Sequence, residues 1–295
     1  MGMATPVVID DGCYATKFGF AGDGAPPRTF RTVVGTPRAV DAEKRIIVAE
    51  RALENISSLQ LHYPMKRSDI MNFKYMVPLW EHVFEHLDLE TRDQAVLLSH
   101  YPTSRQNPLS IAEVFYETLN VPHLHIANPA ELALYAHNRD TGLVIDIGHS
   151  TCYVTPVIHG RFLEVFMVDI AGVHITDYFS RLVNKRESGF FSVPSANMVK
   201  EKLCFISSNY ESEHSTCDEE ILYELPDGQV INVKKKECMQ APEILFTPSL
   251  CALKRMDLPR CVRTHIFCEA KEYAGALYNN ILLTGGTSLL PGLSE

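Results

Sequence analysis

The sequence predicts an α/β protein with two domains, and three short segments carry that prediction. Residues 7–13 (VVIDDGC) and 143–150 (LVIDIGHS) each contain an apolar run, an aspartate, one further residue and a glycine. A β-like run follows each segment, so each is typical of a strand, an acidic turn and a second strand. Residues 280–286 (NILLTGG) form a third strand, which runs into paired glycines. Three strand-to-glycine turns are the parts of a two-domain α/β clamp.

Two such hairpins favour a nucleotide as the ligand. Backbone N–H groups of facing turns can hold a phosphate chain, and the carboxylates of Asp10 and Asp146 can hold a hydrated cation. One Asp-x-Gly after a strand is most often only a turn, so each copy also has a purely structural reading. The repetition, together with Gly285 and Gly286, favours the functional reading. We therefore expect Asp10 and Asp146 to face each other across one cleft.

Composition narrows the function classes. The chain has 295 residues, of which 46% are hydrophobic and 21% charged, which is ordinary for a globular protein large enough for two cores. Its net charge of −9 disfavours a nucleic-acid groove, since phosphate backbones need clustered Lys and Arg. The dense basic run at 234–236 is interpreted as a solvated strand end or loop.

Cysteine usage predicts a reducing compartment. The eight cysteines include no C-x-x-C pair and show neither zinc spacing nor a small disulfide framework. The N-terminus shows no signal peptide or long apolar stretch. We expect free thiols in the cytosol or nucleus.

The remaining elements follow in order along the chain. Residues 18–27 form a Gly/Pro-rich turn region, and 28–65 mix strands and loops. Apolar residues at helical spacing predict a helix within 70–90. A buried strand is expected at 95–98, a helix at 108–119, a strand at 124–127, and a helix at 129–137 that Pro129 opens.

The second half restarts the strand pattern near Asp140. Its middle, roughly 187–253, is more polar and irregular, with a helix predicted at 195–207 and Ser195 as its cap. We place the first domain at 1–136, with a small subdomain at about 28–65. The second domain spans 137–295, with a small subdomain at about 171–253.

The segments between these turns resemble actin and the actin-related proteins, in the same order and over nearly the whole chain. They are KFGFAGD (17–23), VGTPR (34–38), FYETLNVP (115–122), DIAG (169–172), KEKLC (200–204), ELPDGQVI (224–231), PEILFTPS (242–249) and TGGTSLLPG (284–292). The sequence is identified as a divergent member of this family, short at its C-terminus.

This resemblance implies an actin-like fold, in which two RNase H-like domains enclose ATP or ADP with Mg²⁺. Carried over by position, the first phosphate hairpin includes Asp10, Gly12, Cys13, Tyr14 and Lys17. The second includes Asp146, Gly148, His149 and Ser150, and the two aspartates lie near the metal. The resemblance also implies that adenosine is flanked by Lys200 and Glu201 and lined on its other side by Gly285, Gly286 and Leu289.

The most consequential departure is Pro129, which occupies the position of the family's water-orienting glutamine. Proline offers neither a side-chain polar group nor an N–H. Neighbouring Asn128 is the alternative water-orienting group. We expect no efficient ATPase and no catalytic residue.

The phosphate hairpins also depart from the family pattern. His149 replaces an acidic residue, Cys13 a hydroxyl, Tyr14 a glycine and Asn197 an arginine. These changes are expected to weaken nucleotide binding or to remove it.

Two segments that form filament contacts in the family are altered. The loop between Arg38 and Ile46 is short and charged, and residues 250–255 (LCALKR) carry charge where the family has an apolar plug. We expect no self-polymerisation. The chain stops at Glu295, where the family continues, so we expect either a shortened form or a partner that covers the exposed surface.

Residues 82–86 (HVFEH) match the H-x-x-E-H zinc-peptidase pattern. His82 and His86 are expected to share a helix face opposite the core, and the segment aligns with an ordinary helix of the family. We therefore expect no metal there.

The sequence thus predicts a structural, nucleotide-binding actin-related protein in the cytoplasm, as a subunit of a cytoskeletal or motor complex of the dynactin or axonemal dynein type. The alternatives are a subunit of a nuclear chromatin remodeller and a polymerising ATPase. Other protein subunits are the expected partners, and neither nucleic acid nor membrane is.

Overall fold

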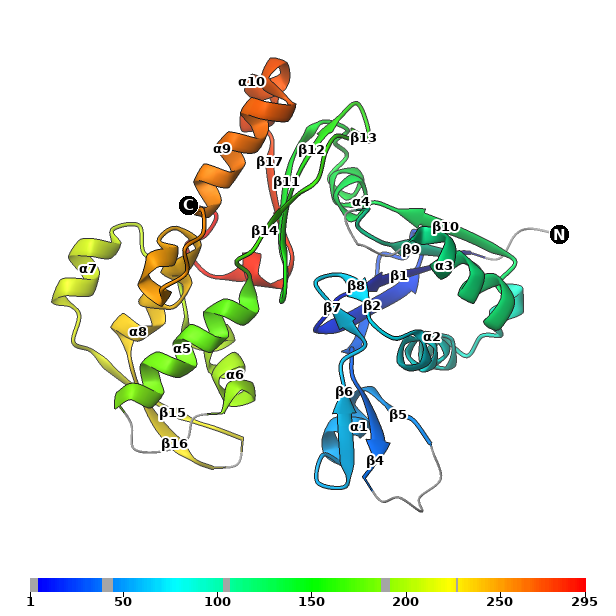
Figure 1. The fold of residues 1–295 in the computed structure, drawn as a ribbon, viewed down its shortest axis with the longest axis horizontal. Coiled ribbons are helices and arrows are strands. Elements are labelled where there is room, and N and C mark those ends of the chain that lie inside the picture. The colour runs from blue at the N-terminus through cyan, green and yellow to red at the C-terminus, as the bar shows by residue number, and fades with distance from the viewer. Residues whose placement is uncertain (1–4, 39–44, 103–106, 187–191, 227) are drawn as a thin grey trace. The chain divides into compact units, whose positions relative to one another are not determined.

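A computed structural model describes residues 5–38, 45–102, 107–186, 192–226 and 228–295. The chain divides into two compact units, Met1–His137 (unit 1) and Asn138–Glu295 (unit 2). Each combines sheets with covering helices, which confirms the predicted α/β class (Figure 1).

Unit 1 is built on a five-stranded sheet in the order β10-β9-β1-β2-β3, with a smaller sheet β5-β4-β6 and the short pair β7 and β8. β1 and β2 form an antiparallel hairpin, while β9 runs parallel to both β1 and β10. Its strands are β1 (Val7–Asp11), β2 (Ala15–Phe20), β3 (Arg28–Arg31), β4 (Val34–Pro37), β5 (Ile47–Val48), β6 (Leu59–His62), β7 (Met65–Lys66), β8 (Asp69–Ile70), β9 (Ala95–Ser99) and β10 (His123–Ala127). Its helices are α1 (Ala49–Glu54), α2 (Phe73–Leu87), α3 (Pro108–Glu113) and α4 (Pro129–Ala136).

The core of unit 1 lies between this sheet and α2. The apolar residues of α2 recur at helical spacing, so Met76, Leu79, Trp80 and Val83 are all fully buried. Trp80 packs on Phe115, with ring centroids 4.6 Å apart. Asn72 caps the helix by accepting a hydrogen bond from the N–H of Lys74 at 2.9 Å.

Unit 2 repeats the hairpin within a second five-stranded sheet, ordered β13-β12-β11-β17 with β14 also paired to β12. Its strands are β11 (Gly142–Ile147), β12 (Cys152–Ile158), β13 (Arg161–Phe162), β14 (Phe166–Val168), β15 (Glu220–Glu224), β16 (Val230–Lys234) and β17 (Ile281–Thr284). Its helices are α5 (Gly172–Arg186), α6 (Val193–Leu203), α7 (Tyr210–Thr216), α8 (Lys235–Gln240), α9 (Leu258–Glu269) and α10 (Ala274–Tyr278).

Unit 2 has two apolar cores. One gathers residues of α5, α6 and α8 with the β15–β16 pair, and includes Phe179, Val199 and Ile244. The other packs α9 and α10 against β11 and β12, and includes Leu143, Ile266 and Leu277.

Both units place an aspartate in the same local setting. Asp10 on β1 pairs in register with Ser99, the last residue of the parallel strand β9. Asp146 on β11 pairs in register with Thr284, the last residue of the parallel strand β17. The carboxyl end of a strand is where ligands bind in α/β sheets. Each unit therefore presents one carboxylate at such an edge.

Some elements differ from the sequence prediction. Helix α6 is capped by Ser192, whose hydroxyl accepts from the N–H of Ser195, because Pro194 fixes the first turn two residues earlier. Residues 28–31 join the large sheet and not the small one. The segment at 187–253 was expected to be largely irregular because it is polar, but it includes the regular elements from α6 to α8.

Within the part of the chain that the structure describes, none of the helices has the length and apolar character needed to cross a membrane.

Candidate functional site

The first candidate half-site is the turn between β1 and β2 in unit 1. The N–H of Gly12 donates to the carbonyl of Ala15 at 3.1 Å and closes the turn. A Cβ on Gly12 would lie 2.7 Å from that oxygen, so the tight turn requires glycine. The predicted residues from Asp10 to Lys17 therefore share one hairpin.

Asp10 and Lys17 form an ion pair next to the turn of this hairpin. The Nζ atom of Lys17 lies 2.9 Å from Oδ2 of Asp10, and the two side chains are 51% and 42% exposed. Oδ1 of Asp10 accepts a hydrogen bond from the hydroxyl of Ser99. Such a pair leaves a cation and a carboxylate accessible to phosphate and to a hydrated metal.

Asp11 is a functional-site neighbour that the sequence analysis did not single out. Its Oδ2 accepts from the indole N–H of Trp80 at 2.8 Å, and its Oδ1 from the hydroxyl of Thr16 at 3.2 Å. Although the residue as a whole is half-buried, its carboxyl group lies among these buried side chains. This burial raises its pKa to about 7, against the smaller opposing effect of the Trp80 hydrogen bond. The sequence feature that could have identified Asp11 is the pair of consecutive aspartates, Asp10 and Asp11.

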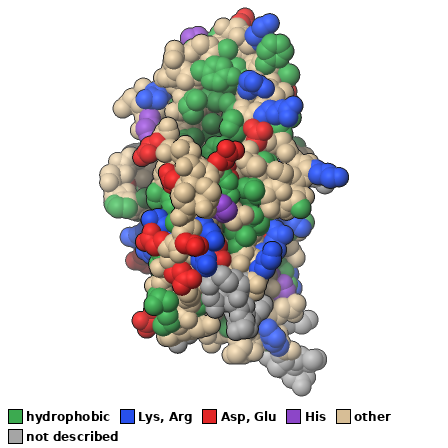
Figure 2. Space-filling model, turned by 90° about the vertical axis from the view of Figure 1, so that its left-hand side faces the viewer, with side chains coloured by type: hydrophobic (Ala, Val, Ile, Leu, Met, Phe, Trp, Pro, Cys, Tyr) green, Lys and Arg blue, Asp and Glu red, His purple; other side chains and the backbone are tan. Residues whose placement is uncertain are grey.

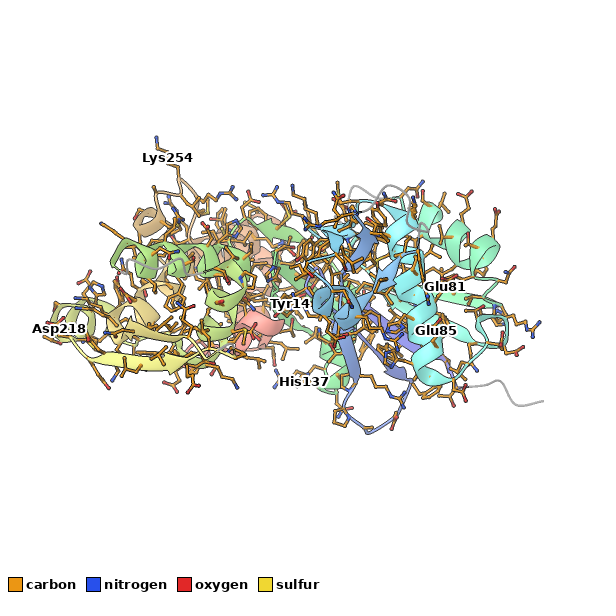
Figure 3. All side chains as sticks on the ribbon, turned by 90° about the horizontal axis from the view of Figure 1, so that it is seen from below. Tyr14, Glu81, Glu85, His137, Asp218 and Lys254 are labelled. Carbon is orange, nitrogen blue, oxygen red and sulfur yellow. The ribbon has the colours of Figure 1, made fainter. Side chains whose placement is uncertain are left out.

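The side chains of Cys13 and Tyr14 both contact other residues of unit 1. The sulfur of Cys13 accepts from the N–H of Ser68 at 3.5 Å. The Tyr14 ring lies under the guanidinium of Arg31, 3.7 Å from its centroid (Tyr14 is labelled in Figure 3). Tyr14 is not among the residues with positive φ, so the turn accepts a side chain where the family has glycine.

The second candidate half-site is the turn between β11 and β12 in unit 2, which three segments hold in place. The N–H of Gly148 donates to the carbonyl of Thr151 at 2.8 Å. The carbonyl of Gly148 accepts from the N–H of Gly172 at 3.0 Å and from the hydroxyl of Thr287 at 2.9 Å. The carbonyl of His149 accepts from the N–H of Val173 at 2.6 Å. The turn is thus fixed to the start of α5 and to the turn after β17.

One feature of this turn fits a phosphate, and a second concerns the close approach of Gly285 to Asp146. The hydroxyl oxygen of Ser150 is buried and has no hydrogen-bond partner among the described residues. A buried hydroxyl without a partner is costly, and a phosphate oxygen would supply one. Gly285 has φ +84°, and a Cβ there would lie 2.3 Å from Oδ1 of Asp146. The backbone after β17 can therefore approach Asp146 only as glycine.

Lys200 lies beside this turn as a buried cation. Its Nζ donates to the hydroxyl of Thr176 at 3.0 Å and to Oδ1 of Asn197 at 2.9 Å, and the residue is 5% exposed. Burial lowers its pKa. Asn197 in turn donates from Nδ2 to Oε1 of Glu201 at 2.7 Å. The substituted Asn197 therefore joins the two predicted adenosine residues in one network.

The turn after β17 holds the other predicted lining residues. A Cβ on Gly286 would meet no atom within 4 Å, and Leu289 is 81% exposed. Leu289 is therefore open to contact, although a single exposed apolar side chain does not by itself mark a site.

The structure gives Asn128 a different role from water orientation. Its Oδ1 caps α4 by accepting from the N–H of Ala130 at 2.9 Å, and Pro129 is the first residue of that helix. The residue is 5% exposed, and its Nδ2 has no partner among the described residues. One of the two lone pairs of this oxygen is therefore engaged by the helix cap.

A nucleotide fits these residues better than a metal held by protein alone. Among the described residues, no three His, Cys, Asp or Glu side chains gather in a way that could hold an ion. Mg²⁺ in proteins usually takes one or two carboxylates and completes its shell with phosphate oxygens and water. Asp10 in unit 1 and Asp146 in unit 2 each present one carboxylate of the kind that such an ion takes.

Comparison with known proteins gives a consistent result. A family model described as Actin matches residues 1–295. The chain is 32% identical, over 308 aligned positions, to the Dictyostelium discoideum protein described as "Putative actin-29". The alignment covers 98% of this chain and 79% of that relative.

Proposed function

The chain belongs to the actin family, and from this premise we propose that it is a structural actin-related protein that binds nucleotide without hydrolysing it efficiently. ATP or ADP with Mg²⁺ serves it as a brace that stabilises the folded protein. It does not polymerise alone, and it acts in the cytoplasm as one protein subunit of a larger cytoskeletal or motor assembly, of the dynactin or axonemal dynein type.

The observation that carries this proposal is the start of α4. Proline at position 129 has no group that could orient water, and the side-chain oxygen of Asn128 is committed to the helix cap. Hydrolysis needs an acceptor within hydrogen-bond reach of the attacking water. Pro129 supplies none, and Asn128 has only the second lone pair of a capping oxygen, on a side chain that is almost fully buried.

Residues 248–255 support the absence of self-polymerisation. Leu250 and Leu253 pack against the apolar core around α5, α6 and α8. Arg255 pairs with Asp169, with Nη1 and Oδ2 2.8 Å apart, and also donates to the Asp169 carbonyl at 2.8 Å. This segment is therefore bound to its own unit, and Lys254 projects from it as an exposed charge (Figure 3). A charged segment resists burial against a second strand.

The basic run at 234–236 supports partners other than nucleic acid. Lys234 lies 3.7 Å from Glu220, Lys235 lies 2.6 Å from Glu219, and Lys236 lies 3.2 Å from Asp218. Acidic and basic side chains are also interspersed on the face that Figure 2 shows. A run whose charges are each matched by a carboxylate offers little attraction to phosphate backbones.

The test is to measure melting temperature, phosphate release and sedimentation of the purified protein with Mg²⁺ and ATP or ADP. A ligand at a hundredfold excess over its dissociation constant adds about 2.7 kcal/mol, which raises the melting temperature by several degrees. Lys17→Met removes the exposed phosphate-facing charge and is expected to abolish most of this rise. Lys74→Met, an exposed lysine on α2, is the matched control and should keep it.

We expect no phosphate release above the blank and no pelleting. Phosphate release at an actin-like rate together with pelleted filaments would refute the proposal in favour of a polymerising ATPase. Absence of any nucleotide-dependent rise would refute the brace but leave the structural role to be tested by partner capture.

A further inference from the structure

Two histidines on α2 are held with their ring nitrogens against each other. The Nε2 atoms of His82 and His86 lie 3.1 Å apart, and the ring centroids are 4.4 Å apart. The Nδ1 atom of His82 lies 3.1 Å from Oε2 of Glu85. Glu85 is labelled on this helix in Figure 3, together with Glu81. The spacing of four residues puts both imidazoles on one helix face, as the sequence predicted. The prediction that this face lies opposite the core was wrong, because Phe30 of the unit 1 core packs against both rings.

Neighbouring aromatic rings fix both imidazoles. Phe30, a buried residue of β3, packs against His82 at 5.2 Å and against His86 at 6.2 Å between centroids, nearly parallel to the latter. Phe18 lies 5.8 Å from His86. Arg28 also donates to the carbonyl of His86. Rings held in place by packing lose little further freedom when they bind a ligand.

The hydrogen bonds define which nitrogen can bind an ion. When Nδ1–H of His82 donates to the Glu85 carboxylate, the lone pair of its Nε2 faces Nε2 of His86. With the proton of His86 on Nδ1, its Nε2 also carries a free lone pair. Nitrogens 3.1 Å apart can both ligate one ion that lies to the side of the line joining them, at the usual metal–imidazole length of about 2.0 Å. A carboxylate behind a metal-bound histidine is the usual arrangement that fixes its tautomer.

We propose that His82 and His86 form a two-imidazole site for a late first-row transition-metal ion, with Glu85 positioning His82 and water completing the shell. This revises the expectation that the H-x-x-E-H segment binds no metal. In the described part of the chain no third ligating side chain joins the pair, so the site takes an ion that tolerates solvent ligands. It is independent of the proposed nucleotide function.

The ligand chemistry of imidazole determines the relative affinity of this site for different metal ions. Affinity follows Cu²⁺ above Ni²⁺ and Zn²⁺, whereas Mg²⁺ and Ca²⁺ prefer oxygen ligands and do not compete. The site therefore differs in its choice of ion from the carboxylates Asp10 and Asp146.

The test is calorimetric titration of the full chain with ZnCl₂ in excess Mg²⁺ and ADP. Cys268 is exposed, so Cys268→Ser serves as the parent and removes an accessible thiol. We expect one strong site in the parent, and its loss in His82→Ala and in His86→Ala. Glu85→Gln is expected to weaken binding about tenfold, the low end of outer-shell effects. His137→Ala, an exposed histidine away from α2, is the control and should bind as the parent does.

Cu²⁺ electron paramagnetic resonance gives a second readout. The parent should show coupling to two imidazole nitrogens, and each single variant to one. Zn²⁺ affinity that is equal in His86→Ala and the parent, or coupling to fewer than two imidazole nitrogens in the parent, would overturn the proposal. His86 and Glu85 are both exposed, so their variants remain decisive even if His82→Ala fails to fold.

Discussion

Asp11 is the residue at which pH should act most directly on the fold. Its pKa is raised from 3.8 to about 7, so the folded protein binds a proton that the unfolded chain releases between these values. The stability present with the carboxyl protonated is therefore lost as pH rises from about 4 to 7. Asp11→Asn keeps the acceptor for Trp80 and can donate to Thr16, without a buried charge.

We predict that Asp11→Asn raises the free energy of unfolding at pH 7.5 by roughly 2–4 kcal/mol, and by less at pH 5. Urea denaturation at the two pH values measures this difference. Asp23→Asn, at an exposed turn, is the control and should change little at either pH. An Asp11→Asn gain that is equal at both pH values would contradict the assigned cause.

Thr287 is a second residue with a testable single contact. Thr287→Val keeps the shape of the side chain and removes its hydrogen bond to the Gly148 carbonyl. That carbonyl still accepts a hydrogen bond from the N–H of Gly172. We predict a loss of about 1 kcal/mol in unfolding free energy, and weaker nucleotide binding because the second turn loosens. Thermal melts with and without ADP check both effects. Thr264→Val, on the exposed side of α9, is the control.

At the scale of elements, variants of the α4 cap distinguish a structural role of Asn128 from a role in hydrolysis. Asn128→Ala removes the side-chain acceptor for Ala130 and should destabilise the protein by about 1 kcal/mol. Asn128→Ser restores a capping oxygen and should recover most of this loss. Chemical denaturation measures the stability of both variants.

Phosphate release should not differ between the parent protein and these Asn128 variants. Release above the blank by the parent that Asn128→Ala loses and Asn128→Ser keeps would show instead that this residue orients water.

Local sequence predicted the elements best where the signal was itself local. The apolar spacing of α2, the turn glycine Gly12 and the proline that opens α4 each act within one turn of chain, and each predicted element is present. The cap of α6 was assigned to Ser195, whereas Ser192 performs it. Several serines near one proline cannot be told apart until the first turn is fixed.

At the scale of the whole molecule, the described cores belong to separate units. Leu79 is buried in unit 1 and Ile244 in unit 2. We predict two calorimetric unfolding transitions. Leu79→Ala should lower the transition temperature of one unit, and Ile244→Ala that of the other. Each change should reduce the unfolding free energy of its own unit by about 2–5 kcal/mol, the usual cost of such a cavity. A single transition that both variants lower equally would show one cooperative unit.

The candidate site was predictable in its backbone but not in its side-chain partners. The two Asp-x-Gly turns and the family resemblance located the hairpins. The contacts of Asp11 with Trp80, of Cys13 with Ser68 and of Gly148 with Thr287 join residues 55 to 139 positions apart. No local pattern encodes such pairs, because the fold as a whole brings them together.

The network around Gly172 has a consequence for how unit 2 would sense a bound molecule. The amide of Gly172 holds the Gly148 turn, and its carbonyl lies 3.0 Å from the Thr176 hydroxyl, which leads through Lys200 and Asn197 to Glu201. The turn proposed to bind phosphate and the residues proposed to flank adenosine are thereby linked through one short stretch of helix. A change at one end, such as loss of a terminal phosphoryl group, would be transmitted to the other, so amide exchange at Gly172 and Val173 should slow together when either end is filled.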